Sequence, residues 1–207
     1  MSRKKNITSL NITKNKNWAS SWHVYKEEYH LLFQEDIILY SYIRSQFAAL
    51  EKSNISSVRL YRLNNFTVID LTITSLNSLS KNLLSEFLNN VNIFFKKNIF
   101  LALNKFSFIQ TLKNGFVIAL KIAKLIEKRI RFRSKTVKLL LKKIKDNCKG
   151  IYVQCTGRIN NVDMARSDKL YLGPLPLQSI YSSISYGFVV ANTTKGLQSI
   201  KVWICKY

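Results

Sequence analysis

The sequence has few acidic residues, and this scarcity narrows what the chain can bind. Eleven Asp and Glu residues face 33 Lys and Arg residues, which gives a net charge of +22 at pH 7. A folded chain with that imbalance repels itself unless a polyanion neutralises the charge. Nucleic acid is therefore the first candidate partner, and an anionic membrane surface is the second.

Cysteine is scarce as well, and its pattern argues against disulfide and metal chemistry. Cys148, Cys155 and Cys205 are odd in number and form no CxxC pair, so we expect buried free thiols in a reducing compartment. His23 and His30 have no Cys or carboxylate pair at ligand spacing. The sequence also lacks a phosphate-binding glycine loop, a catalytic triad and a paired-carboxylate site. It predicts no enzyme, no metal and no cofactor.

Long hydrophobic runs are missing too, although the chain is not polar overall. The longest run, residues 116–126, is interrupted by Lys121 and Lys124, and it stays below the roughly 18 residues that span a bilayer. Residues 1–17 are basic but have no apolar core, so they are unlike a secretory signal and resemble a mitochondrial presequence only weakly. Hydrophobic residues still make up 47% of the 207, which is enough for a folded core.

Hydrophobic periodicity predicts an α+β chain with two small domains. The first domain should run helix, strand, strand, helix, strand, over residues 35–50, 56–63, 66–74, 80–95 and 98–106. Two basic helices, at 113–131 and 135–147, should lead into a mainly antiparallel sheet with strands at 150–158, 183–191 and 197–205. This predicts three parts: a basic N-terminal arm (1–34), a first domain (35–112) and a second domain that includes the helix pair (113–207).

The second basic helix has one charged and one apolar face. A stripe of lysines recurs at helical spacing, while apolar residues gather on a different face: Lys135, Lys138, Lys142, Lys145 and Lys149 against Val137, Leu140, Leu141, Ile144 and Cys148. Ser134 stands at the expected N-cap. Between Lys121 and Lys149 only two acids, Glu127 and Asp146, face twelve bases. A face that is merely solvated usually mixes both signs of charge, and a helix on a membrane surface usually has aromatic anchors on its apolar face. This helix has few acids and no Trp or Phe on its apolar face, so phosphate binding is favoured over both alternatives.

Residues 150–207 contain six short motifs in a fixed order: Thr156–Arg158, Met164–Arg166, Gly173–Leu177, Tyr186, Thr193–Gly196 and Lys201–Ile204. They answer S/T-G-R, I-A-R, G-x-x-P-L, a strand Tyr, T-T-x-G and K-V-W-I, and with them this segment resembles the C-terminal domain of the small-subunit ribosomal protein S3 family. Fainter matches lie upstream, where Trp18, Ser20 and Trp22 answer W-x-S-x-W. Glu127–Arg129 and Phe132–Arg133 answer L-E-x-R-x-x-F-R.

The resemblance implies a KH-like first domain of the type II order, but one defining loop is altered. A working KH domain clamps nucleotides with a GxxG loop, which should fall near residues 75–82. Residues 1–114 contain no glycine at all. We therefore expect a KH-like scaffold that has lost its nucleotide clamp.

The resemblance also implies a structural role in the head of the small ribosomal subunit, with rRNA and mRNA as partners. The expected RNA-binding residues are Arg3, Lys4, Lys5, Arg129, Arg131, Arg133, Lys135, Lys138, Lys142, Lys145, Lys149, Arg158, Arg166 and Lys195. Arg131, Arg133, Lys135 and Lys138 should contact mRNA at its entry. Ser134 and Val137 replace basic residues of the family, so any residue-specific unwinding of mRNA should be weakened while diffuse charge remains.

Several other expectations complete the interpretation. Trp18 and Trp22 should pin the N-terminal arm to a protein or RNA groove, and Trp203 should lie in the core. Phosphate or protein contacts of Arg158 and Arg166 are favoured over ion pairs with Asp163 or Asp168.

Neighbouring proteins ten and fourteen of the small subunit are implied partners, and no membrane is. Phe, Tyr, Met, Ile, Asn and Lys total 89 residues against 25 for Gly, Ala, Arg and Pro, which indicates an AT-rich genome. A mitochondrial ribosome and an organelle-encoded gene are therefore expected, with a plastid as the alternative. A free RNA- or DNA-binding accessory factor for splicing or repair is the competing function.

Overall fold

The computed structural model describes residue 12 and residues 17–48, 55–63, 66–74, 81–95, 98–105 and 107–207. Helices and strands are mixed throughout these residues, which confirms the predicted α+β class. The chain divides into an N-terminal unit, Trp18–Ser107, and a C-terminal unit that contains Phe108–Tyr207. Each unit carries its own four-stranded sheet.

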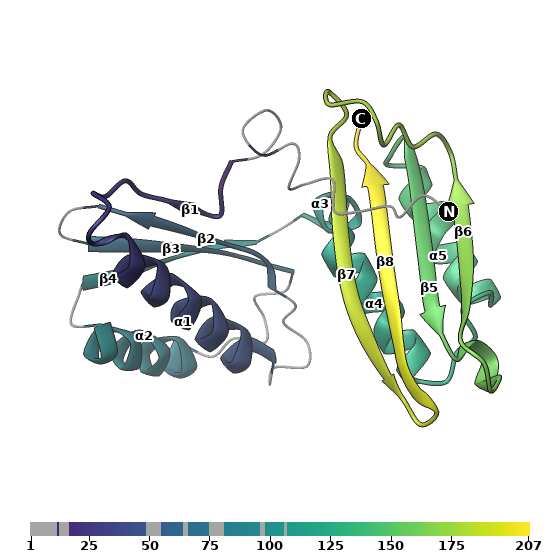
Figure 1. Cartoon of the computed structure of the whole chain (residues 1–207), viewed down its shortest axis with the longest axis horizontal. Coiled ribbons are helices and arrows are strands. Elements are labelled where there is room, and N and C mark those ends of the chain that lie inside the picture. The colour runs from purple at the N-terminus through teal and green to yellow at the C-terminus, as the bar shows by residue number, and fades with distance from the viewer. Residues whose placement is uncertain are drawn as a thin grey trace. The chain divides into compact units, whose positions relative to one another are not determined.

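The N-terminal unit consists of one mixed sheet and two helices (Figure 1). Its elements are β1 (Ser20–Ser21), α1 (Tyr29–Ala48), β2 (Ile55–Arg62), β3 (Phe66–Ile73), α2 (Lys81–Phe95) and β4 (Asn98–Lys105). The strands are ordered β1-β2-β3-β4, with β2 and β3 antiparallel and the two outer pairs parallel. After β1, the predicted order helix, strand, strand, helix, strand is confirmed.

The core of this unit lies between the sheet and the two helices. Strand alternation places Leu60, Ile69 and Leu71 on the buried side. They form one cluster with Leu39 and Ile43 of α1 and with Phe87 and Val91 of α2. The predicted half-buried strand over 66–74 is therefore confirmed in its inward residues.

Helix α1 begins at Tyr29, six residues before the predicted start at Glu35. The early start places Tyr29 and Phe33 one turn apart, and their rings stack at 5.9 Å. Trp22 packs against Tyr29 at 5.3 Å. The six added residues thus belong to the helix, where Tyr29 and Phe33 stack on each other while both stay about half exposed.

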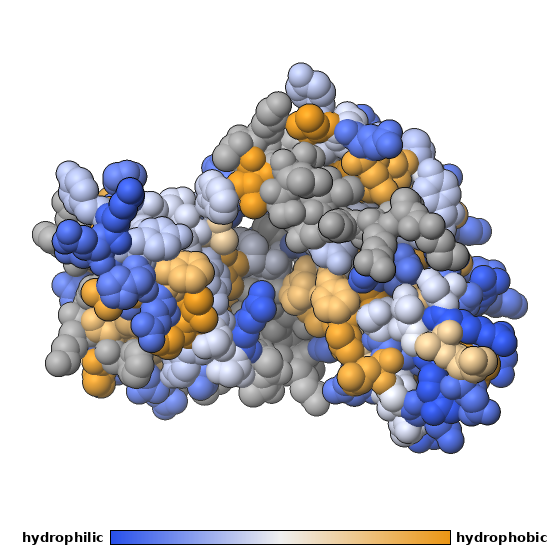
Figure 2. Space-filling model, viewed as in Figure 1, coloured by the Kyte–Doolittle hydropathy of each residue, from blue (hydrophilic) through white to orange (hydrophobic). Residues whose placement is uncertain are grey.

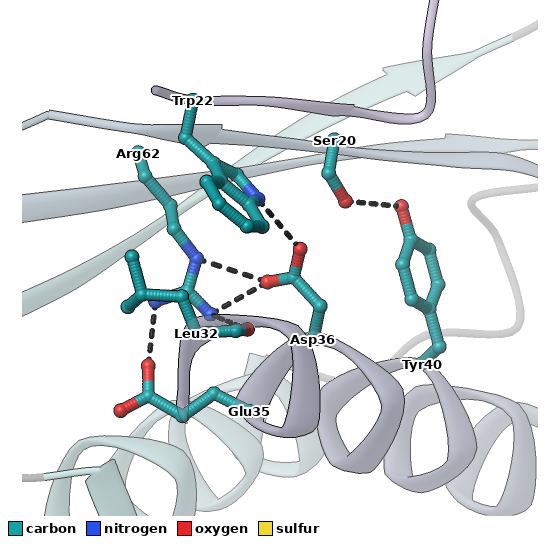
Figure 3. A network of polar contacts seen from close by, with 7 residues as sticks. All are labelled: Ser20, Trp22, Leu32, Glu35, Asp36, Tyr40 and Arg62. Atoms are coloured by element: carbon teal, nitrogen blue, oxygen red, sulfur yellow. Dashed lines mark hydrogen bonds and ion pairs between the residues drawn. The ribbon is translucent and has the colours of Figure 1, made fainter. Parts of the chain in front are cut away.

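A buried ion pair links α1 to β2 and to the segment before α1 (Figure 3). Arg62 donates from Nε to Oδ1 of Asp36 at 2.9 Å and from Nη1 to Oε2 of Glu35 at 2.6 Å. Trp22 Nε1 donates to the other Asp36 oxygen at 2.8 Å. Both charged groups are nearly inaccessible, with side-chain exposures of 7% for Arg62 and 5% for Asp36.

This network changes the interpretation of the predicted arm. Trp22 anchors its own chain to Asp36, whereas the sequence suggested a protein or RNA groove as its partner. Ser20 pairs in register with Leu60 of β2. The part of residues 1–34 from Trp18 onward is therefore packed within the N-terminal unit.

The C-terminal unit is an antiparallel sheet covered by helices on one face (Figure 1). Its elements are α3 (Phe108–Leu112), α4 (Gly115–Glu127), α5 (Lys135–Lys145), β5 (Gly150–Gly157), the short 3-10 helix η2 (Ile159–Asn161), β6 (Arg166–Leu172), β7 (Ile184–Thr193) and β8 (Gly196–Cys205). The strand order is β6-β5-β8-β7, with every pairing antiparallel. The predicted mainly antiparallel sheet is confirmed.

Two details of this unit differ from the sequence prediction. The first predicted helix, 113–131, is present but shorter, because α4 begins at Gly115, where Asn114 caps it by accepting the Phe116 N–H at 3.0 Å, and ends at Glu127. Strand β6 was not predicted, because polar residues dominate Arg166–Lys169 and show no alternation.

Helix α4 lies unusually close to β7 because two glycines face each other. A Cβ at Gly187 would come within 2.3 Å of the Gly115 carbonyl carbon, and the Gly115 N–H donates to Ser185 Oγ at 2.9 Å. Only glycine permits this approach of helix backbone to strand backbone. The contact positions the start of α4 and hence the helix pair that follows it.

We expect Asp36→Ala to destabilise the N-terminal unit by about 3 kcal/mol, because it leaves the buried Arg62 charge without its main partner. Glu35→Ala is the matched control and should cost about 1 kcal/mol, since Arg62 keeps Asp36. Hydrogen exchange of peptides from α1 and β2 measures both losses, with β5 and β8 peptides as an internal reference. Equal losses for the two variants would contradict the assignment of Asp36 as the main partner.

Candidate nucleic-acid interface

Helix α5 is fixed on the sheet by its apolar face. Ser134 caps the helix, as predicted, with Oγ accepting the Val137 N–H at 3.5 Å. Val137, Leu141 and Ile144 are at most 2% exposed and belong to the core of the C-terminal unit. Cys148 is also buried and Leu140 partly so, which confirms the predicted apolar face.

The opposite face of α5 is basic and exposed. The basic stripe consists of Lys135, Lys138, Lys142 and Lys145 on α5 and of Lys149, which was predicted on the same helix but lies beyond its end at Lys145; all five are exposed. None of the five forms an ion pair with a carboxylate in the described part of the chain. Three lysines in the last turn, Lys142, Lys143 and Lys145, suit the negative end of the helix dipole. The stripe therefore presents positive charge that no carboxylate of the described residues neutralises.

The connection between α4 and α5 carries three more exposed bases, all of them arginines. Arg129, Arg131 and Arg133 are all exposed, while Phe132 between them is only 3% exposed and anchors the segment in the core. Arg133 pairs with Asp168 of β6 at 3.2 Å, but its side chain is 64% exposed, so the pair contributes little. The four residues predicted to contact mRNA thus lie on one continuous segment.

The remaining predicted RNA-binding residues are scattered. Arg158 keeps its side chain 37% exposed and donates from Nε to the Val162 carbonyl at 3.0 Å and from Nη2 to Asp163 at 2.8 Å. This is the ion pair that the sequence analysis ranked second. Arg166 begins β6 and Lys195 lies in the β7–β8 turn, both exposed. Arg3, Lys4 and Lys5 lie outside the described residues.

A cavity of about 660 Å³ opens beside the arginine-rich connection. The end of α4, the connection and the β7–β8 turn line it, together with Ile159 and Asn160 of η2. Arg129, Arg131 and Lys195 come together around this space, and no sequence pattern grouped them. Asn160 and Asn192 also line it, and no local motif would have identified them.

The cysteines offer no reactive thiolate. All three are buried and free, as predicted. Burial raises the pKa of Cys155 to about 11, and burial also raises the pKa of Cys148 and of Cys205. Thiols with raised pKa values stay protonated at neutral pH, so they behave as small core residues. Trp203 is likewise a core residue, with no exposed surface, as predicted.

The face of the C-terminal sheet that carries no helix has a different character. Trp203 contacts the rings of Tyr152 and Tyr186 there, at 5.2 and 5.3 Å. Figure 2 shows hydrophobic and hydrophilic residues side by side on this unit. Tyr171 and Phe188 are 56% and 45% exposed.

Within the described residues, no helix combines the length and the apolar character needed to cross a bilayer.

Comparison with known proteins gives a consistent result. Residues 122–204 match the family model described as ribosomal protein S3, C-terminal domain. Over 204 residues the chain is 31% identical to small ribosomal subunit protein uS3 of Dictyoglomus turgidum, covering 95% of this chain and 79% of that protein. It is 29% identical to uS3c of Guillardia theta, covering 99% and 94%, and 27% identical to uS3c of Euglena longa, covering 100% of both.

The basic stripe should contribute little net stability, because repulsion between its lysines offsets the favourable interaction of Lys142 and Lys145 with the helix dipole. Replacing Lys138, Lys142 and Lys145 together by Gln removes like-charge neighbours that cost a few tenths of a kcal/mol per pair. Urea denaturation should therefore show an unchanged or slightly higher stability for this variant, whereas Leu141→Ala should lose about 3 kcal/mol. A large loss in the triple Gln variant would mean that the lysines have structural partners.

Proposed function

Because the chain belongs to the ribosomal protein S3 family and is a structural constituent of the small ribosomal subunit, we propose that its α4–α5 connection and basic stripe form its rRNA-binding surface. The family is structural and not enzymatic, and its partners are small-subunit rRNA and ribosomal proteins. The proposal concerns which residues of this chain make the contacts.

The proposal rests on one observation, which is that α5 carries its apolar residues on one face and its lysines on another. Its apolar residues are buried, and its lysines are exposed and pair with none of the carboxylates that the structure describes. Such a surface releases condensed counterions when it meets RNA phosphates, which makes binding favourable and dependent on salt. Contacts of this kind position the protein on the RNA and do not read its sequence.

Arg131, Arg133, Lys135 and Lys138 form the part of this surface that we assign to incoming mRNA. Two positions that are basic in the family are used here for folding: Ser134 caps α5 and Val137 is fully buried. The neighbouring bases, Arg131, Lys135 and Lys138, are exposed and supply positive charge there. They should hold mRNA electrostatically and contribute little residue-specific unwinding.

We assign the N-terminal unit a KH-like scaffold role without nucleotide clamping. Its helix, strand, strand, helix, strand order supports the type II arrangement, and residues 1–114 contain no glycine for a GxxG loop. Most of the loop in question, residues 75–80, lies outside the described residues.

The protein neighbours expected from the family are small-subunit proteins ten and fourteen, in the head of the subunit. Exposed aromatic residues such as Tyr171 and Phe188 make the helix-free face of the C-terminal sheet suitable for a protein partner. The relatives named uS3c and the AT-rich residue usage support an organellar ribosome. We place the chain in the mitochondrion, with the plastid as the alternative.

Sedimentation of an organelle lysate tests the ribosomal assignment. We expect the chain to remain in the small-subunit peak at both moderate and high salt, because many shared contacts hold an integral protein. Loss from the peak at high salt alone would favour a peripheral RNA- or DNA-binding accessory factor. Occurrence only in light fractions would contradict the assignment. The same sedimentation carried out separately on purified mitochondria and on purified plastids shows which organelle contains the chain.

Arg133→Ala tests the diffuse-charge assignment at the mRNA entry. Subunits assembled with this variant should retain more than half of the mRNA-unwinding rate, because Arg131, Lys135 and Lys138 remain and Arg133 already shares its charge with Asp168. The triple variant Arg131→Ala/Lys135→Ala/Lys138→Ala should lose much more. Complete loss in Arg133→Ala alone would show that one residue carries the activity.

A further inference from the structure

The cavity beside the α4–α5 connection has the size and position of a ligand site. Its volume of about 660 Å³ lies within the range of roughly 300–1,000 Å³ that is common for small-molecule pockets. The end of α4 and the connection form one wall, and the β7–β8 turn forms the other. Glu127 Oε1 accepts the Asn192 N–H at 3.2 Å and so ties the two walls together.

Backbone strain is concentrated at this cavity. Among the described residues, Arg129 (φ 62°) and Asn160 (φ 58°) are the non-glycine residues with positive φ, and both line it. Arg129 follows the last turn of α4, where its N–H donates to the Ile126 carbonyl at 2.8 Å and the Ile130 N–H donates to Leu125 at 3.0 Å. Glycine is the usual residue at this position of such a helix end. Left-handed residues that are not glycine concentrate at functional sites.

The lining has three kinds of surface. Arg129, Arg131 and Lys195 are cations, and Glu127 is the acid that accompanies them. Asn160 and Asn192 bring side-chain amides, which can both donate and accept hydrogen bonds. The apolar part of the wall comes from Ile126, Phe132 and Ile159. A bare phosphate would use the cations alone and would be repelled by Glu127.

We propose that this cavity receives a single unstacked nucleotide of the bound RNA, an inference that rests on the rRNA-binding surface proposed above. The base lies against the apolar wall, the amides and Glu127 meet the hydrogen-bonding groups of its edge, and the cations bind the flanking phosphates. Unpaired bases that leave the stack are the parts of RNA that proteins read most specifically. The cavity therefore adds recognition of one bulged or looped nucleotide to a surface that otherwise binds phosphates.

The two left-handed positions allow a clean test, because glycine there removes a side chain and relieves the backbone. Arg129→Gly and Asn160→Gly should keep or raise the melting temperature of the chain. Lys145→Gln is the matched control, since it removes an exposed base of the stripe that does not line the cavity. The probes are two RNA hairpins of equal stem length, one with a single bulged 2-aminopurine and one with that base paired.

The 207-residue chain should bind the bulged hairpin roughly tenfold more tightly than the paired one, with a change in 2-aminopurine fluorescence. Both glycine variants should reduce this preference to about twofold or less. Arg129→Gly should also reduce the slope of the logarithm of the binding constant against the logarithm of salt concentration by about one, as expected for the loss of one phosphate contact. Lys145→Gln should weaken binding to both hairpins equally and leave the preference intact.

Other results separate this inference from the proposed function. Equal, salt-dependent binding of both hairpins by the unmodified chain would overturn the nucleotide pocket and leave the phosphate-binding surface standing. A preference that persists in both glycine variants would place recognition elsewhere and also overturn the pocket. Binding of neither hairpin would overturn both proposals.

Discussion

The burial of Val137, Leu141 and Ile144 against the C-terminal sheet is the constraint on which the RNA-binding surface depends. A helix can bury only one face, so fixing these three side chains turns Lys138, Lys142 and Lys145 outward. The interaction energies show that packing of the apolar face, and not the charges, sets the orientation of α5. Each buried aliphatic side chain contributes about 1.5–3 kcal/mol, while like charges on the helix cost a few tenths of a kcal/mol per pair. The core therefore holds the positive stripe in place, and a polyanion relieves the repulsion.

In the N-terminal unit, by contrast, charged side chains are buried and paired with each other. Arg62 is buried, and it is tolerated because Asp36 and Glu35 accept its hydrogen bonds and Trp22 satisfies the remaining Asp36 oxygen. A buried ion pair adds little net stability, but it penalises any arrangement that separates its members. It therefore specifies how the segment before α1 lies on β2. One unit uses charge to define its own fold, and the other exposes charge to a partner.

The sequence predicted well the features that depend on local periodicity. The apolar face of α5, its Ser134 cap and the alternating strand β3 all follow from patterns within one element. The misses involve residues distant in sequence. Arg62 lies 26 residues from Asp36, and Asn192 lies 65 residues from Glu127, so no local pattern could pair them. Strand β6 escaped prediction because it forms by pairing with β5 at the sheet edge, where its polar side chains face solvent.

The family itself was recognisable from short motifs, but motifs do not give geometry. Thr156–Arg158 answers the family's S/T-G-R motif, which suggested a phosphate or protein contact for Arg158, yet Arg158 donates to the Val162 carbonyl and to Asp163. Thr193–Gly196 reads as a turn, and the structure adds that it forms one wall of a cavity. Residue type indicates which chemistry is available, while long-range packing decides whether a side chain is used inside the molecule or offered to a partner.

The short α4–α5 connection shows how folding can prepare a basic segment for binding. The left-handed turn at Arg129 ends α4 with both terminal hydrogen bonds made, Phe132 is buried, and Ser134 starts α5. Backbone freedom is thus removed on both sides of Arg131 and Arg133 before any RNA arrives. A disordered basic loop would lose about 1–2 kcal/mol per residue on ordering, and a fixed connection avoids most of that cost. The strain at Arg129 is small by comparison, at about 1–2 kcal/mol, so a rigid connection is the more favourable arrangement for a protein whose function is to hold RNA.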